Sequence, residues 1–131
     1  MKHFLSLLIL FSFMTLASAT CIEEENIEAY NFAQKVKQSF EKKDLSAVIQ
    51  LIAFVEDDLY PMPNFTNKSF EDLFSDEWNR EILNSEIECR PLGLKGWMLG
   101  NGKIWYGIAN KHYISNSEFK SLAIFSINII K

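Results

Sequence analysis

The chain has 131 residues, of which 13 are basic and 17 acidic, and its formal net charge is −4. Because the basic residues are scattered along a mildly acidic chain, nucleic acids and anionic lipid surfaces are not expected partners. The length suits a single domain with one hydrophobic core. His3 lies in an N-terminal segment with the pattern of a signal peptide, and one remaining histidine with two distant cysteines cannot supply a standard zinc site. No dinucleotide fingerprint or nucleophile elbow occurs, so no metal or cofactor is expected.

Residues 1–19 have the pattern of a secretory signal peptide. Lys2 gives a basic start, residues 4–14 form an apolar run, and Ala17-Ser18-Ala19 is a small-x-small cleavage site. The run is too short to cross a bilayer as a helix. We therefore expect a protein exported to the periplasm or secreted, with residues 20–131 forming one domain and no transmembrane segment.

Cys21 and Cys89 are the two cysteines of the chain. In an exported protein such a pair first predicts one disulfide, which would tie the start of the domain to its sheet. The competing hypothesis is a lipoprotein signal with an acylated Cys21, although Thr20 is a poor residue before a lipid-carrying cysteine. A catalytic Cys89 ranks third because only His112 would remain as its partner.

Two neighbouring helices are expected first. Apolar residues recur at three- to four-residue spacing from Glu23 to about Phe40, with acidic residues in the first turn. Asp44 is a suitable N-cap for a second helix that runs to about Phe54. The short connection should place the two helices side by side.

Residues 56–63 contain two prolines and are expected to form a loop or an edge segment. Asp57 and Asp58 are paired carboxylates in this loop, and adjacent aspartates in a polar loop are more often solvated than catalytic. Asn64 and Asn67 each begin a triplet that matches the N-glycosylation pattern, which matters only in a eukaryotic cell.

Two shorter helices should follow. Thr66 or Asn67 is expected to cap a helix that carries Phe70. Ser75 is expected to cap the next helix, which has acidic residues in its first turn and runs to about Leu83.

The sequence Asn101-Gly102 predicts a tight β-hairpin turn, because these residues tolerate the positive φ angles of a type I′ turn. Trp97 and Leu99 should share one face of the first strand, with Met98 on the other. The adjacent Gly100 leaves the register open. We expect a ring from a neighbouring element to cover Gly96 and Gly107, because glycine has no side chain of its own to pack there.

A short strand over residues 111–115 and a long final strand over residues 119–130 complete the expected elements. The final strand is almost continuously apolar, which favours a position within the sheet over one at its edge. Helices followed by an antiparallel meander predict an α+β fold, with the N-terminal helices packed on a curved antiparallel sheet.

This arrangement resembles the cystatin-like cone of the nuclear transport factor 2 superfamily. Residues 31–48, 70–83 and 96–106 carry the resemblance. More narrowly, the chain is similar to small bacterial exported proteins of uncharacterised function with that fold. The resemblance implies an apolar pocket between the sheet and the long helix, which some members use for isomerase or dehydratase chemistry and others only for binding.

Three functional hypotheses follow. The favoured one is an exported, non-catalytic protein that binds a small apolar ligand or a protein partner through Trp97, Trp105 and Tyr106, although core packing is the commoner role of such aromatics. The second is an enzyme with Asp58 or His112 as general base. The third is an inhibitor or immunity protein that acts on a secreted enzyme. A second copy of the chain is a further candidate partner.

Overall fold

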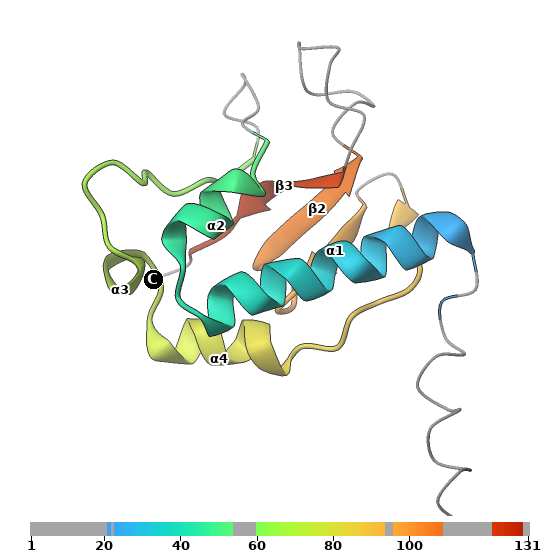
Figure 1. Ribbon diagram of the computed structural model, residues 1–131, viewed down its shortest axis with the longest axis horizontal. Coiled ribbons are helices and arrows are strands. Elements are labelled where there is room, and N and C mark those ends of the chain that lie inside the picture. Colours follow the sequence, from blue (N-terminus) through green and yellow to red (C-terminus); the bar gives the residue numbers. More distant parts are fainter. Residues whose placement is uncertain (1–20, 22, 54–59, 94–95, 109–121, 130–131) are drawn as a thin grey trace, which may run out of the picture.

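The computed structural model describes residues 21, 23–53, 60–93, 96–108 and 122–129. Within these residues the chain forms four helices and then a three-stranded sheet, which confirms the α+β class (Figure 1). The elements are α1 (Glu24–Glu41), α2 (Leu45–Gln50), α3 (Phe70–Leu73), α4 (Asp76–Asn84), β1 (Trp97–Leu99), β2 (Ile104–Ile108) and β3 (Leu122–Ile127).

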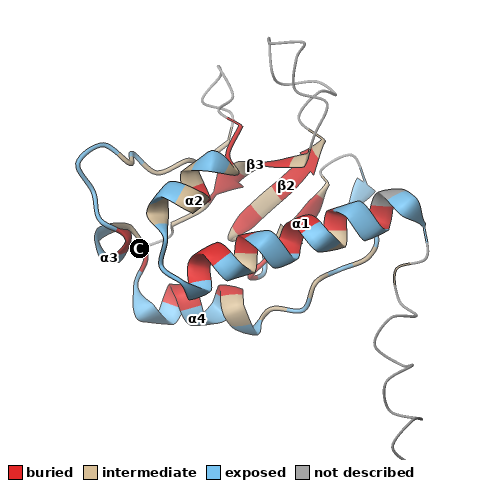
Figure 2. Cartoon of the chain, viewed as in Figure 1, coloured by how far each residue is buried: buried red, intermediate tan, exposed pale blue. Residues whose placement is uncertain are grey.

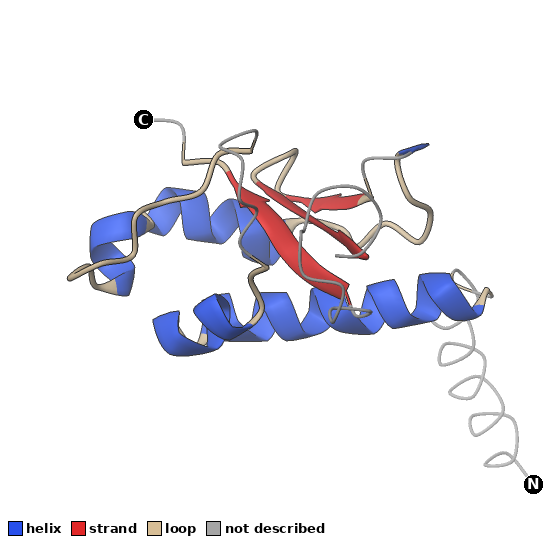
Figure 3. Cartoon of the chain, turned by 90° about the horizontal axis from the view of Figure 1, so that it is seen from above, coloured by secondary structure: helices blue, strands red, loops and turns tan. Residues whose placement is uncertain are grey.

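The long helix α1 organises the helical part of the fold. It packs against both α2 and α4, and it runs along one side of the three strands (Figures 1 and 3). Its buried residues recur at helical spacing and form one stripe, while most of its other described side chains are exposed (Figure 2). The prediction from Glu23 to Phe40 is correct to within one residue at each end.

The sheet is antiparallel, in the order β1-β2-β3. Leu99 lies opposite Ile104, so the hairpin loop contains four residues, Gly100 to Lys103, and not two. Asn101 and Gly102 have φ angles of 60° and 90°, as the turn prediction required. Gly100 also has a positive φ, of 61°, and this third left-handed residue accommodates the longer loop.

Among the described strands, the final strand comes last in the order, whereas its sequence predicted a place within the sheet. Its outer side is nevertheless paired. The Ala53 N–H donates to the Ile124 carbonyl and the Ile124 N–H donates to the Leu51 carbonyl, each at 2.8 Å. The Ile127 N–H donates to the Pro61 carbonyl at 2.9 Å. Because this edge is covered by Leu51–Ala53 and Pro61, an apolar sequence is tolerated there.

The same contacts correct the second helix, which ends at Gln50 and not near Phe54. Leu51 to Ala53 leave the helix and pair with β3, a long-range interaction that the local pattern does not contain. Its start is as predicted, because the Asp44 carboxylate accepts from the Ala47 N–H at 3.1 Å.

The two later helices also begin at side-chain caps. The Ser75 hydroxyl accepts from the Trp78 N–H at 3.1 Å, which confirms the predicted start of α4. The predicted cap of α3 is wrong: Ser69, and neither Thr66 nor Asn67, forms a capping box with Asp72. In this motif each of the two residues satisfies the backbone N–H of the other. Asn67 instead lies in the preceding turn, with a φ of 55°.

Several predictions fall on residues that the structure does not describe. These are the signal peptide, Asp57, Asp58, His112, the strand over residues 111–115 and the outer parts of the strand over residues 119–130. Among the described helices, none is both long and apolar enough to cross a membrane.

Candidate functional site

The structure separates the three aromatic residues that the sequence grouped together. Trp97 and Tyr106 are buried on the side of the sheet that faces α1, and their rings stack with centroids 6.1 Å apart. Trp105 precedes Tyr106 in β2 and is only half-buried, opposite Met98 on the neighbouring strand. Since successive residues of a strand point to opposite faces, Trp105 belongs to the outer face.

The space between α1 and the sheet is filled by these rings and their neighbours. Phe32 of α1 packs on Tyr106 with ring centroids 5.6 Å apart, and Trp97 donates from its indole Nε1 to the Cys89 carbonyl at 3.2 Å. The Tyr106 hydroxyl is buried and makes no hydrogen bond within the described part of the chain. Burial, with a smaller contribution from the charge of Glu88, raises the pKa of this phenol, which makes it a poor acid or base.

The outer face of the sheet carries a second group of partly exposed apolar side chains. Met98, Trp105 and Phe125 are half-buried, and Tyr60 packs edge-on against Phe125 with centroids 5.2 Å apart. The Phe125 ring also lies 3.5 Å from the position that a Cβ on Gly107 would take, so the prediction of a ring over this glycine is confirmed.

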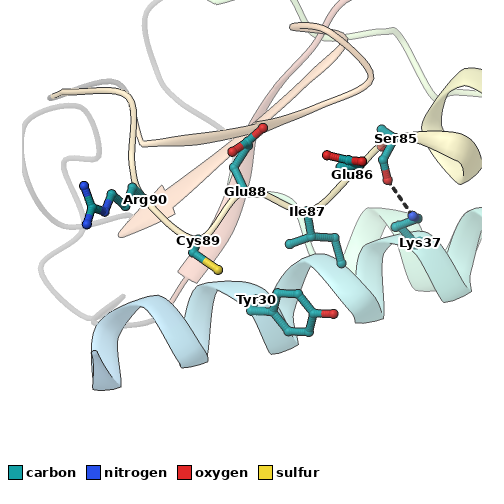
Figure 4. A pocket seen from close by; sticks show the side chains of 8 residues that line it. All are labelled: Tyr30, Lys37, Ser85, Glu86, Ile87, Glu88, Cys89 and Arg90. Atoms are coloured by element: carbon teal, nitrogen blue, oxygen red, sulfur yellow. Dashed lines mark hydrogen bonds between the residues drawn. The ribbon is translucent and has the colours of Figure 1, made fainter. Parts of the chain in front are cut away.

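An open cleft lies between α1 and the segment Ser85–Arg90, which we call the strap (Figure 4). Its volume is about 610 Å³. Tyr30 and Lys37 of α1 form one wall, and the strap forms the other (Figure 4). The lining residues are Tyr30, Lys37, Ser85, Glu86, Ile87, Glu88, Cys89 and Arg90.

Both ends of the strap are fixed to the rest of the protein. At its start, Ser85 follows α4, and its carbonyl accepts from the Lys37 ammonium at 2.7 Å. At the other end, Cys89 forms the predicted disulfide with Cys21, with the two Cα atoms 5.2 Å apart. The disulfide is thus confirmed, and it uses the Cys21 sulfur that acylation would need.

Between these anchors, the strap alternates in exposure. Glu86, Glu88 and Arg90 are exposed, whereas Ile87 and Cys89 are partly buried. Such alternation with a period of two is typical of an extended chain with one side packed on the protein. The cleft therefore presents an aromatic ring, an apolar side chain and charges of both signs.

The described residues contain no cluster of metal-binding side chains: no group of three His, Cys, Asp or Glu side chains among them could hold a metal ion. The two candidate bases of the enzyme hypothesis, Asp58 and His112, lie outside the residues that the structure describes. Sequence reasoning missed the cleft, although the pattern Glu86-Ile87-Glu88, between a helix end and a paired cysteine, was a usable signal.

A smaller hollow lies between α4 and the hairpin loop. It has a volume of about 480 Å³, and Glu81, Asn84 and Asn101 are among its lining residues. An ion pair between Lys103 and Glu81 crosses from the hairpin to α4. This ion pair holds the hairpin loop against α4, so the hollow between them is explained by the packing of the fold and needs no ligand.

The chain matches no protein family model, no curated protein and no solved structure. The function must therefore be argued from the geometry of this chain alone.

Proposed function

We propose that the chain is an exported, non-catalytic binding protein, that its partner is a protein, and that the cleft beneath the strap is the contact site. One observation carries the proposal. The interior in which a cone-like protein would hold a small apolar ligand is occupied here by Phe32, Trp97 and Tyr106, and the open volume lies outside it, beside the strap.

The composition of the cleft supports a protein partner over a small apolar ligand. Pockets for small molecules are mostly apolar and enclose their ligand. This cleft is open and carries Lys37 and Arg90 together with Glu86 and Glu88. Protein interfaces have such polar rims and are enriched in tyrosine and arginine, the residue types at Tyr30 and Arg90.

The enzyme hypothesis receives less support. The Tyr106 phenol is buried in the core, and burial raises its pKa, so near neutral pH it stays protonated and is a poor base. The inhibitor hypothesis is a second candidate, because a segment fixed at both ends and exposed between them loses little conformational entropy on docking.

Site-specific photo-crosslinking tests the proposal in cells that express the full chain. A photoreactive amino acid at Glu88 should give a crosslinked protein adduct. The same group at Glu71, an exposed residue of α3 at the other end of the molecule, should not (Figure 1). No adduct at Glu88, or equal adducts at both positions, would contradict the proposal.

Export is tested separately by the intact mass of the protein recovered outside the cytoplasm. A chain that begins at Thr20 supports cleavage after Ala19. A full-length cytoplasmic chain would refute the export part of the proposal and leave the binding part to the crosslinking result.

A further inference from the structure

We propose that the strap binds its partner by strand addition, and that the bound segment is an extended peptide with basic residues at alternate positions. This inference rests on the proposed function, because it names the kind of partner segment that enters the same cleft.

The first support is the backbone of the strap. Within the part of the chain that the structure describes, the N–H and C=O groups of Glu86, Ile87 and Glu88 make no hydrogen bond. The Cys89 carbonyl is already used by the Trp97 indole. Unpaired backbone groups on a surface segment are a template for another strand, and β-strand addition satisfies them.

The second support is that the strap is held in place before any partner arrives. The hydrogen bond from Lys37 to Ser85 fixes its start, and the disulfide from Cys89 to Cys21 fixes its end. Ile87 packs against the hydrophobic core from between them. Because the strap is already anchored at both ends and packed through Ile87, little conformational entropy remains to be lost on binding.

The third support is the charge of the exposed side. Glu86 and Glu88 are both exposed, are two residues apart, and form no ion pair with a described residue. Lys37 is directed to the Ser85 carbonyl and not to these carboxylates. In a paired strand, residues two apart face the same side, so lysine or arginine at alternate positions would lie opposite both carboxylates. Arg90 follows the two glutamates at the same spacing and is itself basic, so the bound peptide needs basic residues at only two positions.

Fluorescence anisotropy with the full disulfide-bonded protein tests the inference. The probe is a short fluorescein-labelled peptide of alternating lysine and valine. One control peptide replaces each lysine with glutamate, and two others carry N-methyl groups on alternate residues of one edge or of the other. The probe should bind and the glutamate peptide should not. N-methylation of the pairing edge should weaken binding by more than about tenfold, because it removes backbone donors.

Protein variants separate the charges from the backbone. The double variant Glu86→Gln/Glu88→Gln should weaken binding on the order of tenfold. The matched double variant Glu71→Gln/Glu77→Gln removes the same charge from α3 and α4 and should leave binding unchanged. Amide hydrogen exchange of residues 86–88 should slow when the peptide is bound.

The inference is overturned if the glutamate peptide binds as well as the lysine peptide. It is equally overturned if both N-methylated peptides bind like the probe, or if exchange at residues 86–88 does not slow. If crosslinking at Glu88 stays specific while the peptide tests fail, the strand-addition inference falls and the proposed function stands. If both fail, both are rejected.

Discussion

Substitution of Gly96 by alanine should be among the most damaging single changes in the sheet. Gly96 immediately precedes β1 and has a φ of 83°. A Cβ at this position would lie 2.5 Å from the Tyr106 carbonyl oxygen and 3.4 Å from the Gly107 Cα. The sequence led us to expect a ring over Gly96, and that expectation is wrong: the close neighbour is backbone.

Two energies add in this variant. A left-handed conformation costs an alanine about 1–2 kcal/mol relative to glycine. The clash adds about 1–3 kcal/mol, as overpacking does elsewhere, since no rotamer change can relieve contact with a backbone oxygen. A shift of the Tyr106 backbone would also disturb its buried stack with Trp97. We therefore expect a total loss of about 2–5 kcal/mol in the free energy of unfolding.

Gly93 provides a matched control. Its φ is 59°, and nothing lies within 4 Å of the position that its Cβ would take. Gly93→Ala should therefore lose only the conformational part, about 1–2 kcal/mol. Both variants stiffen the unfolded chain equally, so the difference between them isolates the clash at Gly96.

Urea unfolding followed by tryptophan fluorescence measures both variants. The free energy of unfolding of Gly96→Ala should be lower than that of Gly93→Ala by about 1–3 kcal/mol. Equal losses would show that the chain does not pass close to the Tyr106 backbone, and the register of β1 against β2 would be refuted.

Three further predictions concern the disulfide and two side chains. The double variant Cys21→Ser/Cys89→Ser removes a crosslink with a sequence separation of 68. In urea titrations it should lower the free energy of unfolding by about 4 kcal/mol. A loss below about 1 kcal/mol would contradict the loop-closure argument. Tyr106→Phe removes a buried hydroxyl that has no described partner and should leave the melting temperature unchanged or raise it; a clear drop would reveal a hydrogen bond. The Ser69 backbone N–H, and to a smaller extent its hydroxyl, lower the pKa of Asp72. The ionised Asp72 therefore stabilises the folded protein above the unfolded-state pKa, and this stabilisation is lost as pH falls through the folded-state pKa. A carboxyl NMR titration that gives Asp72 a pKa at or above that of an unstructured aspartate would refute this.

Local signals predicted the helix starts well. Asp44 and Ser75 each satisfy N–H groups within the next three residues, so the information lies beside the helix that it starts. The end of α2 was not predictable in this way. Leu51 to Ala53 have helical composition, and only their pairing with Ile124, far along the chain, removes them from the helix.

The candidate site was predicted in part. The count of two cysteines indicated the pair Cys21 and Cys89, because two cysteines in a chain that is expected to be exported predict one disulfide. The aromatic residues were correctly placed on the central hairpin, but grouping Trp105 with Tyr106 overlooked the alternation of strand faces. The cleft was missed because it forms between residues of α1 and a strap about fifty positions later.

The sequence by itself determined the α+β class, the starts of α1, α2 and α4, the position of the hairpin turn and the pairing of the cysteines, because caps, periodicity, turn residues and cysteine number act locally or by count. Only the tertiary structure decided that Trp97 and Tyr106 fill the space beneath α1, and that the open volume lies beside the strap. These outcomes depend on how side chains from distant segments share one volume, and neither spacing nor composition encodes that competition.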